Sequence, residues 1–160
     1  MDVPPFARGS TFLAARAFGC YFFGMPKQAY PLPTATAAWS VRDADLADQL
    51  STEPGDAFPP VFATSRMIAL MEIAAARALH PLLEPGELSV GVKVDVHHTA
   101  PTPPGATVTA TARFIEMAGK LYRFEIDVRD DAGEIGRGTH ERAIVHVARL
   151  VDGASKRQRT

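Results

Sequence analysis

Cysteine, excess charge and long apolar segments are all scarce in this sequence of 160 residues. Cys20, the single cysteine, excludes an intrachain disulfide framework and is typical of a reducing compartment, so we expect a cytoplasmic location. The formal net charge of −1 predicts no broad basic surface, which argues against nucleic acid as a partner. No apolar run is long enough for a membrane span, so we expect no membrane partner either.

The hydrophobic fraction of 46% is enough for one globular domain with a substantial core. We place this domain at residues 31–150. Residues 1–30 carry only a short apolar patch that follows Arg16, and they predict a loosely ordered N-terminal extension rather than a secretory signal. Residues 151–160 form a polar basic tail.

The stretch FATSRMIALMEIAAARALHPLL, residues 62–83, dominates the sequence because its interior is apolar on nearly every side. Such a pattern predicts a buried helix, and its alanines, leucines and methionines are strong helix formers. We expect Thr64 or Ser65 to cap the start of the helix. His80-Pro81 should end it, because proline disfavours helix in the residue before it.

Glu72 is the exception in this apolar helix. Its neighbours three and four residues away cannot pair with a carboxylate: Ile68, Ala69, Ala75 and Ala76. Carboxylates are rarely buried without a partner. Glu72 must therefore meet a partner elsewhere in the fold, reach solvent in a cleft, or stay protonated, unless it is a partly exposed acid without a role.

Alternating apolar residues and turn signals predict five strands, with short helical turns near residues 44–50. The expected strands cover residues 34–42, 89–98, 107–114, 121–130 and 134–150. Short turns join the last four, which predicts antiparallel neighbours. The sheet must bury its apolar face on the helix, so the fold class is α+β, with about five strands wrapped around one long central helix.

Strand alternation also assigns directions to two adjacent histidines. His98 shares parity with Val90, Val92, Val94 and Val96, the face expected to look toward the helix, and His97 looks away. His98 is therefore the residue expected to meet Glu72 as an acid–base pair. The alternative is a satisfied core histidine beside an incidental acid. A bulge just before Pro101 would exchange the two histidines.

Several separated segments resemble the hot-dog-fold thioesterases, and within them the fluoroacetyl-CoA thioesterase-like family. They are FPPVFATSRMIALME (58–72), LEPGELSVG (83–91), VHHTAPTPPG (96–105) and EIGRGTHERAIVH (134–146). The resemblance spans roughly residues 57–150. It implies a hot-dog fold, hydrolysis of a small acyl-CoA thioester, and a homodimer with the site at its interface. It implies no cofactor beyond the CoA of the substrate, and no metal.

The resemblance also implies roles for individual residues. The catalytic constellation falls on Thr64, Glu72 and His98, and the positions near substrate fall on Gly91 and Arg142. The fluoroacetate-selective member of the family places aromatic side chains over the acyl group, and the segment STEPGDAFPP offers only Phe58 for that position. These matches imply general acyl-CoA thioesterase chemistry rather than selectivity for fluorine.

Geometry and chemistry leave alternatives open. Thr64 and Glu72 are eight residues apart, or about 12 Å along a helix, so they meet one substrate from different chains or Thr64 has a positioning role. Glu72 is either a general base or a nucleophile. A hot-dog hydratase or dehydratase acting on acyl thioesters, and a non-catalytic acyl-CoA-binding module, are the competing functions.

Overall fold

One long helix and a five-stranded antiparallel sheet make up most of the protein in the computed structural model, which describes residues 34–157. The predicted extension over residues 1–30 lies outside this range. In chain order the elements are β1 (Ala35–Ser40), η1 (Asp43–Asp45), η2 (Ala47–Leu50), α1 (Thr64–Leu79), η3 (His80–Leu82), β2 (Glu87–His98), β3 (Thr107–Ala118), β4 (Leu121–Asp130), β5 (Gly133–His146) and α2 (Val147–Arg157).

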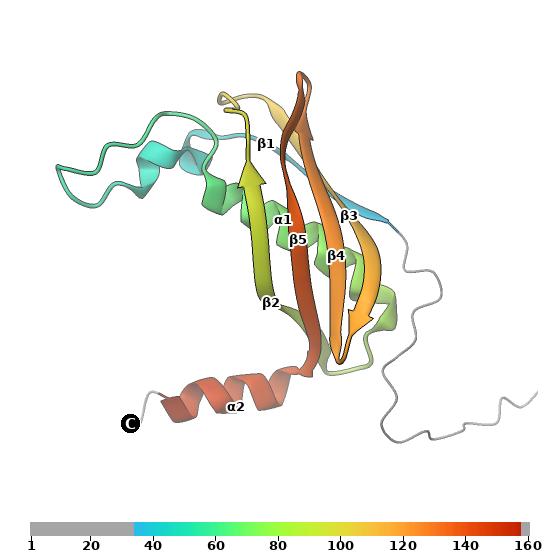
Figure 1. The fold of residues 1–160 in the computed structure, drawn as a ribbon. Helices are drawn as coiled ribbons and strands as arrows, with labels where there is room; N and C mark the ends of the chain where they lie inside the picture. The colour runs from blue at the N-terminus through green and yellow to red at the C-terminus, as the bar shows by residue number, and fades with distance from the viewer. Residues whose placement is uncertain (1–33, 158–160) are drawn as a thin grey trace, which may run out of the picture.

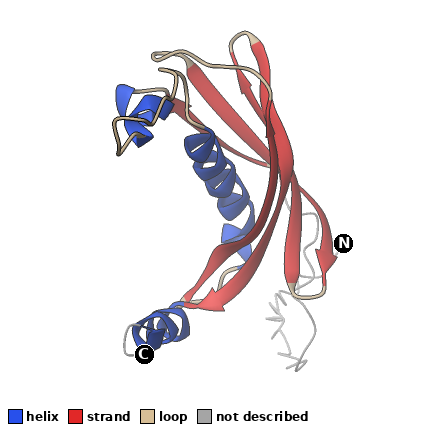
Figure 2. Cartoon of the chain, turned by 60° about the vertical axis from the view of Figure 1, so that its left-hand side comes forward, coloured by secondary structure: helices blue, strands red, loops and turns tan. Residues whose placement is uncertain are grey.

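The sheet has the strand order β1-β3-β4-β5-β2, and each neighbouring pair is antiparallel. It curls around α1, which lies along its concave face (Figures 1 and 2). This arrangement confirms the predicted α+β class. It also leaves β1 and β2 as the two edges of the sheet within one chain.

The core forms where β3 and β4 face α1. Alternate residues of both strands are buried, as their period-two pattern predicted: Val108, Ala110, Ala112, Tyr122, Phe124, Ile126 and Val128. They pack against helix residues such as Met67, Leu70 and Ala74, which are fully buried. Burial of this apolar surface fixes the helix on the sheet and thereby fixes the position of each polar residue that α1 carries.

Helix α1 ends at Leu79, before the His80–Leu82 turn, as the histidine–proline pair predicted. Its start differs from the expectation. Ala63 occupies the N-cap position and makes no side-chain capping bond, so the predicted caps, Thr64 and Ser65, are both wrong. Thr64 is the first helical residue, and its hydroxyl contacts β2 instead.

The last predicted strand, 134–150, is too long. β5 ends at His146, and residues 147–157 form α2, a helix that the sequence analysis did not anticipate. Val147, Leu150 and Val151 follow a spacing of three and four, which is helical rather than extended. The chain changes from strand to helix where it leaves the sheet (Figure 1). Neither α1 nor any other helix of the described residues is long and apolar enough to cross a membrane.

Strand β2 is not regular, and this changes which residues face the helix. Its register against β5 shifts between Gly91 and Lys93, which leaves Val92 as an extra, largely exposed residue. Gly91 consequently faces α1, whereas the sequence analysis assigned that direction to Val90 and Val92. Beyond the bulge the predicted parity holds, because His98 reaches the helix.

Candidate functional site

Glu72 projects from α1 toward the sheet strands β2 and β5 and remains 44% exposed. Its carboxylate oxygen Oε1 lies 3.5 Å from Nε2 of His140, a residue of β5 whose side chain is 1% exposed. Among the possibilities weighed from the sequence, Glu72 therefore combines two. It has a partner elsewhere in the fold, and it also reaches solvent.

Arg142 lies two residues beyond His140 on the same face of β5 and is also buried. Its Nε donates a hydrogen bond of 3.1 Å to the Ser89 hydroxyl, and its Nη2 donates one of 2.8 Å to the Ser89 carbonyl. Burial lowers the pKa of Arg142, and the nearby Glu72 opposes this shift. The site thus contains a cation held within the protein, near a carboxylate that solvent can reach.

Burial also lowers the pKa of His140 to about 4, and the Arg142 charge adds to the effect, although Glu72 acts in the opposite direction. His140 is consequently neutral at pH 7. Its two ring nitrogens have no hydrogen-bond partner within the described residues. We refer to Glu72, Gly91, His140 and Arg142 as the carboxylate cluster.

Gly91 leaves the room in which this cluster forms. A Cβ atom at this position would collide with Oε1 of Glu72 and lie 2.9 Å from Nε2 of His140. Real Cβ atoms essentially never approach other heavy atoms this closely. A side chain at this position would displace the Glu72 carboxylate, so the glycine allows β2 to pass close to it.

A second group of predicted site residues lies at the start of α1. Oγ1 of Thr64 and Nδ1 of His98 are 2.9 Å apart, and Phe58 lines the same groove of about 340 Å³. Burial lowers the pKa of His98, partly offset by the backbone of Ala100. The imidazole is therefore neutral at pH 7 and can accept or donate one hydrogen bond. We refer to Thr64, His98 and Phe58 as the threonine cluster.

Backbone contacts fix the start of α1 beside β2. The Phe62 amide donates to the carbonyl of Thr102, at 2.8 Å, and the Ala63 amide donates to the carbonyl of Asp45, at 2.9 Å. The buried Asp45 carboxylate also lies 3.7 Å from Arg66 in the first turn of the helix. A hydrogen bond from Arg42 lowers the pKa of Asp45, which keeps this anchor ionised. The start of α1, which carries Thr64, is thus fixed to the segment around Thr102 and to Asp45.

The expected meeting of His98 and Glu72 does not occur within one chain. His98 ends β2 beside the first residue of α1, whereas Glu72 lies about 12 Å further along the helix axis. At the level of Glu72 the neighbouring β2 residue is Gly91. The error arose because strand parity gives a residue's face but not its position along the helix.

His140 is the member of the site that the sequence analysis missed. It shares strand parity with the predicted site residue Arg142, and its neighbour on each adjacent strand is apolar. Those neighbours are Val94 on β2 and Phe124 on β4. A titratable residue between apolar cross-strand neighbours, two positions from a predicted site arginine, is the signal that could have identified it.

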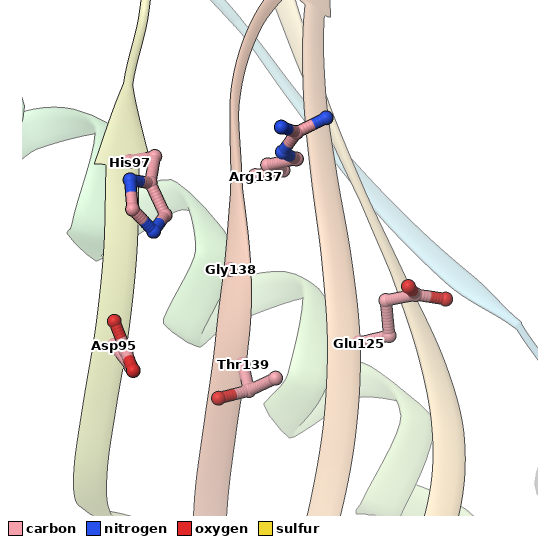
Figure 3. Close-up of a pocket in the computed structure, with 6 residues that line it drawn as sticks. All are labelled: Asp95, His97, Glu125, Arg137, Gly138 and Thr139. Atoms are coloured by element: carbon pink, nitrogen blue, oxygen red, sulfur yellow. The ribbon is translucent and has the colours of Figure 1, made fainter.

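His97 lies on the opposite face of the sheet. It lines a depression of about 240 Å³ on β2, β4 and β5, together with Asp95, Glu125, Arg137, Gly138 and Thr139. Figure 3 shows the side chains of these residues. Helix α1 passes behind the sheet in this view. The predicted outward direction of His97 is therefore confirmed, and the depression is the polar, solvated side of the sheet.

Comparison with known proteins places this fold and site in a family. The family model described as fluoroacetyl-CoA-specific thioesterase matches residues 41–148. The fluoroacetyl-CoA thioesterase of Streptantibioticus cattleyicolor is 48% identical over 103 residues, which are 64% of this chain and 73% of that protein. The residues that the family model matches include both clusters described above.

Solved structures of similar proteins support the same family and fold. A mutant of the fluoroacetyl-CoA-specific thioesterase, in complex with fluoroacetate and CoA, is 42% identical with a TM-score of 0.68, covering 74% of this chain and 96% of its own. A hot-dog-like protein from Thermanaerovibrio acidaminovorans shows the fold alone, at 24% identity and a TM-score of 0.66 over 78% of this chain and 90% of its own. The chain therefore belongs to the fluoroacetyl-CoA-specific thioesterase family, and it is a thioester hydrolase of the hot-dog fold.

Proposed function

We propose that this enzyme hydrolyses a small acyl-CoA thioester to the free acid and CoA, using Thr64, Glu72 and His98. The observation that carries the proposal is the state of Glu72. It is the one acid of helix α1, a half-exposed carboxylate beside the buried His140 and Arg142. A carboxylate at the edge of a low-dielectric site suits proton abstraction from water or direct attack on a carbonyl.

The reaction requires three events, which the two clusters and the start of α1 supply in this proposal. The Glu72 carboxylate either removes a proton from water as the water oxygen attacks the thioester carbon, or attacks that carbon itself. The carbonyl oxygen gains negative charge, which the N–H groups of Thr64 and Ser65 at the start of α1 can stabilise, because the first amides of a helix have no intrahelical acceptor. The carbon–sulfur bond then breaks, and the CoA thiolate takes a proton. If Glu72 is the nucleophile, the acyl group remains on its carboxylate as an anhydride, and water then hydrolyses this anhydride to the free acid.

The threonine cluster handles hydrogen bonds at the thioester end of the substrate in this proposal. Neutral His98 can pass a proton to the leaving thiolate or hold one in place, and the hydroxyl of Thr64, 2.9 Å from its ring, orients the imidazole. A thiol has a pKa near 8.5, taking cysteine as the reference, so protonating the leaving group is a modest demand. Phe58, half-exposed in the same groove, is available to cover the acyl group.

A homodimer with shared sites is the assembly that would join the two clusters. Helix α1 keeps a half-exposed apolar stripe beside Glu72, formed by Ile68, Ala69, Ile73 and Ala76. Next to it, the edge strand β2 exposes Val92 and Val94. An unpaired edge beside an apolar stripe favours a two-fold partner. Such a partner can bring the threonine cluster of one chain to the carboxylate cluster of the other.

Thiol release from a panel of short acyl-CoA esters tests the proposal. The panel should pair acetyl-CoA with fluoroacetyl-CoA, because the family description names fluoroacetyl-CoA and this chain offers Phe58 as an aromatic cover. Release of free CoA that Glu72→Gln abolishes supports hydrolysis. Reversible hydration of an enoyl thioester without thiol release would identify a hydratase, and saturable binding without turnover would identify a binding module.

A further inference from the structure

His140 has no assigned role, yet its burial and position require an explanation. Its side chain is 1% exposed, and both ring nitrogens lack a hydrogen-bond partner within residues 34–157. A buried polar atom without a partner is unusual and often marks a functional site. Its Nε2 lies 3.5 Å from Oε1 of the Glu72 carboxylate.

We infer that His140 is a positioning residue for the reaction, and that its Nε2–H donates a hydrogen bond to Oε1 of Glu72. This inference rests on the proposed role of Glu72. The bond holds one carboxylate oxygen against the sheet and leaves the other oxygen to face water or substrate. At 3.5 Å the two atoms are at the outer limit of hydrogen bonding, and a small movement of the half-exposed Glu72 side chain would shorten the contact.

The protonation state follows from the charges that surround the ring. Arg142 on β5 and Glu72 on α1 are the charged groups that act on His140, whereas Val94 on β2 and Phe124 on β4 do not titrate. Burial and the buried guanidinium keep the imidazole neutral, so it carries one N–H. That hydrogen must be on Nε2, because a lone pair there would face the lone pairs of the carboxylate.

A neutral donor has a specific advantage at this position. A charged histidine would form an ion pair and hold the carboxylate strongly, which would weaken its basicity. A neutral N–H orients the carboxylate with a smaller electrostatic effect. The nearby Arg142 supplies the positive charge, and its hydrogen bonds to Ser89 keep it on the sheet. Orientation and charge thus come from two different residues.

Three variants separate a hydrogen-bonding role from a packing role. His140→Phe keeps an aromatic ring and removes the donor, whereas His140→Gln keeps an N–H donor of similar reach. Phe124→Leu is the matched control, because Phe124 is buried and pairs with His140 across β4 and β5. Turnover, KM and melting temperature are measured for each variant with the acyl-CoA that the wild-type enzyme hydrolyses best.

We expect kcat to fall about tenfold or more in His140→Phe with KM little changed, since the lost bond orients a reacting group. The acid limb of its pH–rate profile should move to higher pH, because a hydrogen bond favours the charged form of a carboxylate. His140→Gln should recover most of the rate. A rate in His140→Phe equal to that of the Phe124→Leu control, or no recovery in His140→Gln, would overturn the inference.

A second measurement does not depend on how the variants fold. Nitrogen NMR of the histidine-labelled wild-type enzyme distinguishes the two neutral tautomers, and we expect His140 to carry its proton on Nε2. A proton on Nδ1 would overturn the inference.

Glu72→Gln distinguishes a failure of the proposed role of Glu72 from a failure of the role of His140. If that variant keeps full activity, the proposed function of Glu72 fails; if it is inactive while His140→Phe is fully active, the role of His140 alone fails.

Discussion

Oγ1 of Thr64 lies 2.9 Å from Nδ1 of His98, which joins the first residue of α1 to the last residue of β2. This contact makes the two adjacent histidines of β2 a direct test of the site. His98→Ala should lower turnover by about a hundredfold or more if the imidazole moves protons. Since Thr64 is exposed, its hydroxyl can turn to water, and the free energy of unfolding should change by no more than about 1 kcal/mol.

His97→Ala is the matched control, because His97 belongs to the polar depression on the other face of the sheet. Its turnover should stay close to that of the wild type. Thiol release and thermal melting of both variants decide the question. An inactive His97→Ala beside an active His98→Ala would show that β2 faces the helix in a different register.

Glu72→Gln keeps the size of the side chain and removes its charge and basicity. We expect turnover to fall by at least about a hundredfold, the range for a positioned acid–base group. The fold should be retained, because the side chain is 44% exposed and fills no part of the core. Thiol release gives the rate and circular dichroism the fold. Turnover near that of the wild type would eliminate the proposed mechanism.

Gly91→Ala tests whether the carboxylate needs the space beside β2. The new methyl group would collide with the mobile end of Glu72, so the carboxylate must move away from His140. We expect turnover to fall about tenfold or more. Gly153→Ala is the control, since nothing lies within 4 Å of the added carbon and the change removes a glycine from α2. That control should keep full activity and gain up to about 1 kcal/mol of stability.

Turnover and the free energy of unfolding are measured for both Gly91→Ala and Gly153→Ala. Loss of activity in Gly91→Ala with a largely intact fold supports a role for the glycine in the site. Equal activity of the two variants would mean that Glu72 tolerates the displacement, and the space at Gly91 would then have only a packing role.

Much of the fold could be predicted because local pattern and tertiary burial agree. In β3 and β4, alternating residues such as Val108 and Phe124 are buried as expected, and proline after His80 marks the end of α1. Two elements depart from the pattern. The bulge at Val92 has no local signal stronger than the preceding glycine, and α2 was missed because its apolar spacing was read as a continued strand.

The site could be predicted only in part, for a different reason. Side-chain parity identified His98 as facing the helix, and the lone acid of an apolar helix identified Glu72. The angle at which the strands cross α1 decides which polar residues lie at the same level of the helix. This angle cannot be predicted from one sequence. His140 therefore takes the place beside Glu72 that was expected for His98.

The stability of the protein should depend on pH through His140. Burial and Arg142 lower its pKa from 6.5 to about 4 in the folded chain, so the unfolded chain binds the proton more readily. Stability from this group is complete above about pH 6.5 and falls as the pH drops toward 4. The total loss should be on the order of 3 kcal/mol.

His140→Gln removes this titration and should flatten the pH dependence over that window. His98 also has a lowered pKa and contributes in the same direction, so the difference between the variant and the wild type is the informative quantity. Denaturant unfolding at several pH values between 4 and 7 measures it. Parallel curves for the two proteins would show that His140 does not remain neutral in the folded state.

Mixing two inactive variants tests whether each site takes residues from both chains of a dimer. In the proposed arrangement, the threonine cluster of one chain meets the carboxylate cluster of its partner. A mixed dimer of His98→Ala and Glu72→Gln chains would then hold one site with both substitutions and one site with neither. Equal amounts, after dissociation and random reassociation, should recover about a quarter of the wild-type rate. If each site lies within one chain, every site keeps a substitution and the mixture stays inactive.

Samples of each variant treated alone are the control, and sedimentation must show dimers in all of them. A mixture as inactive as its components, with dimers present, would eliminate the shared site and leave Thr64 and His98 a positioning role at the far end of α1.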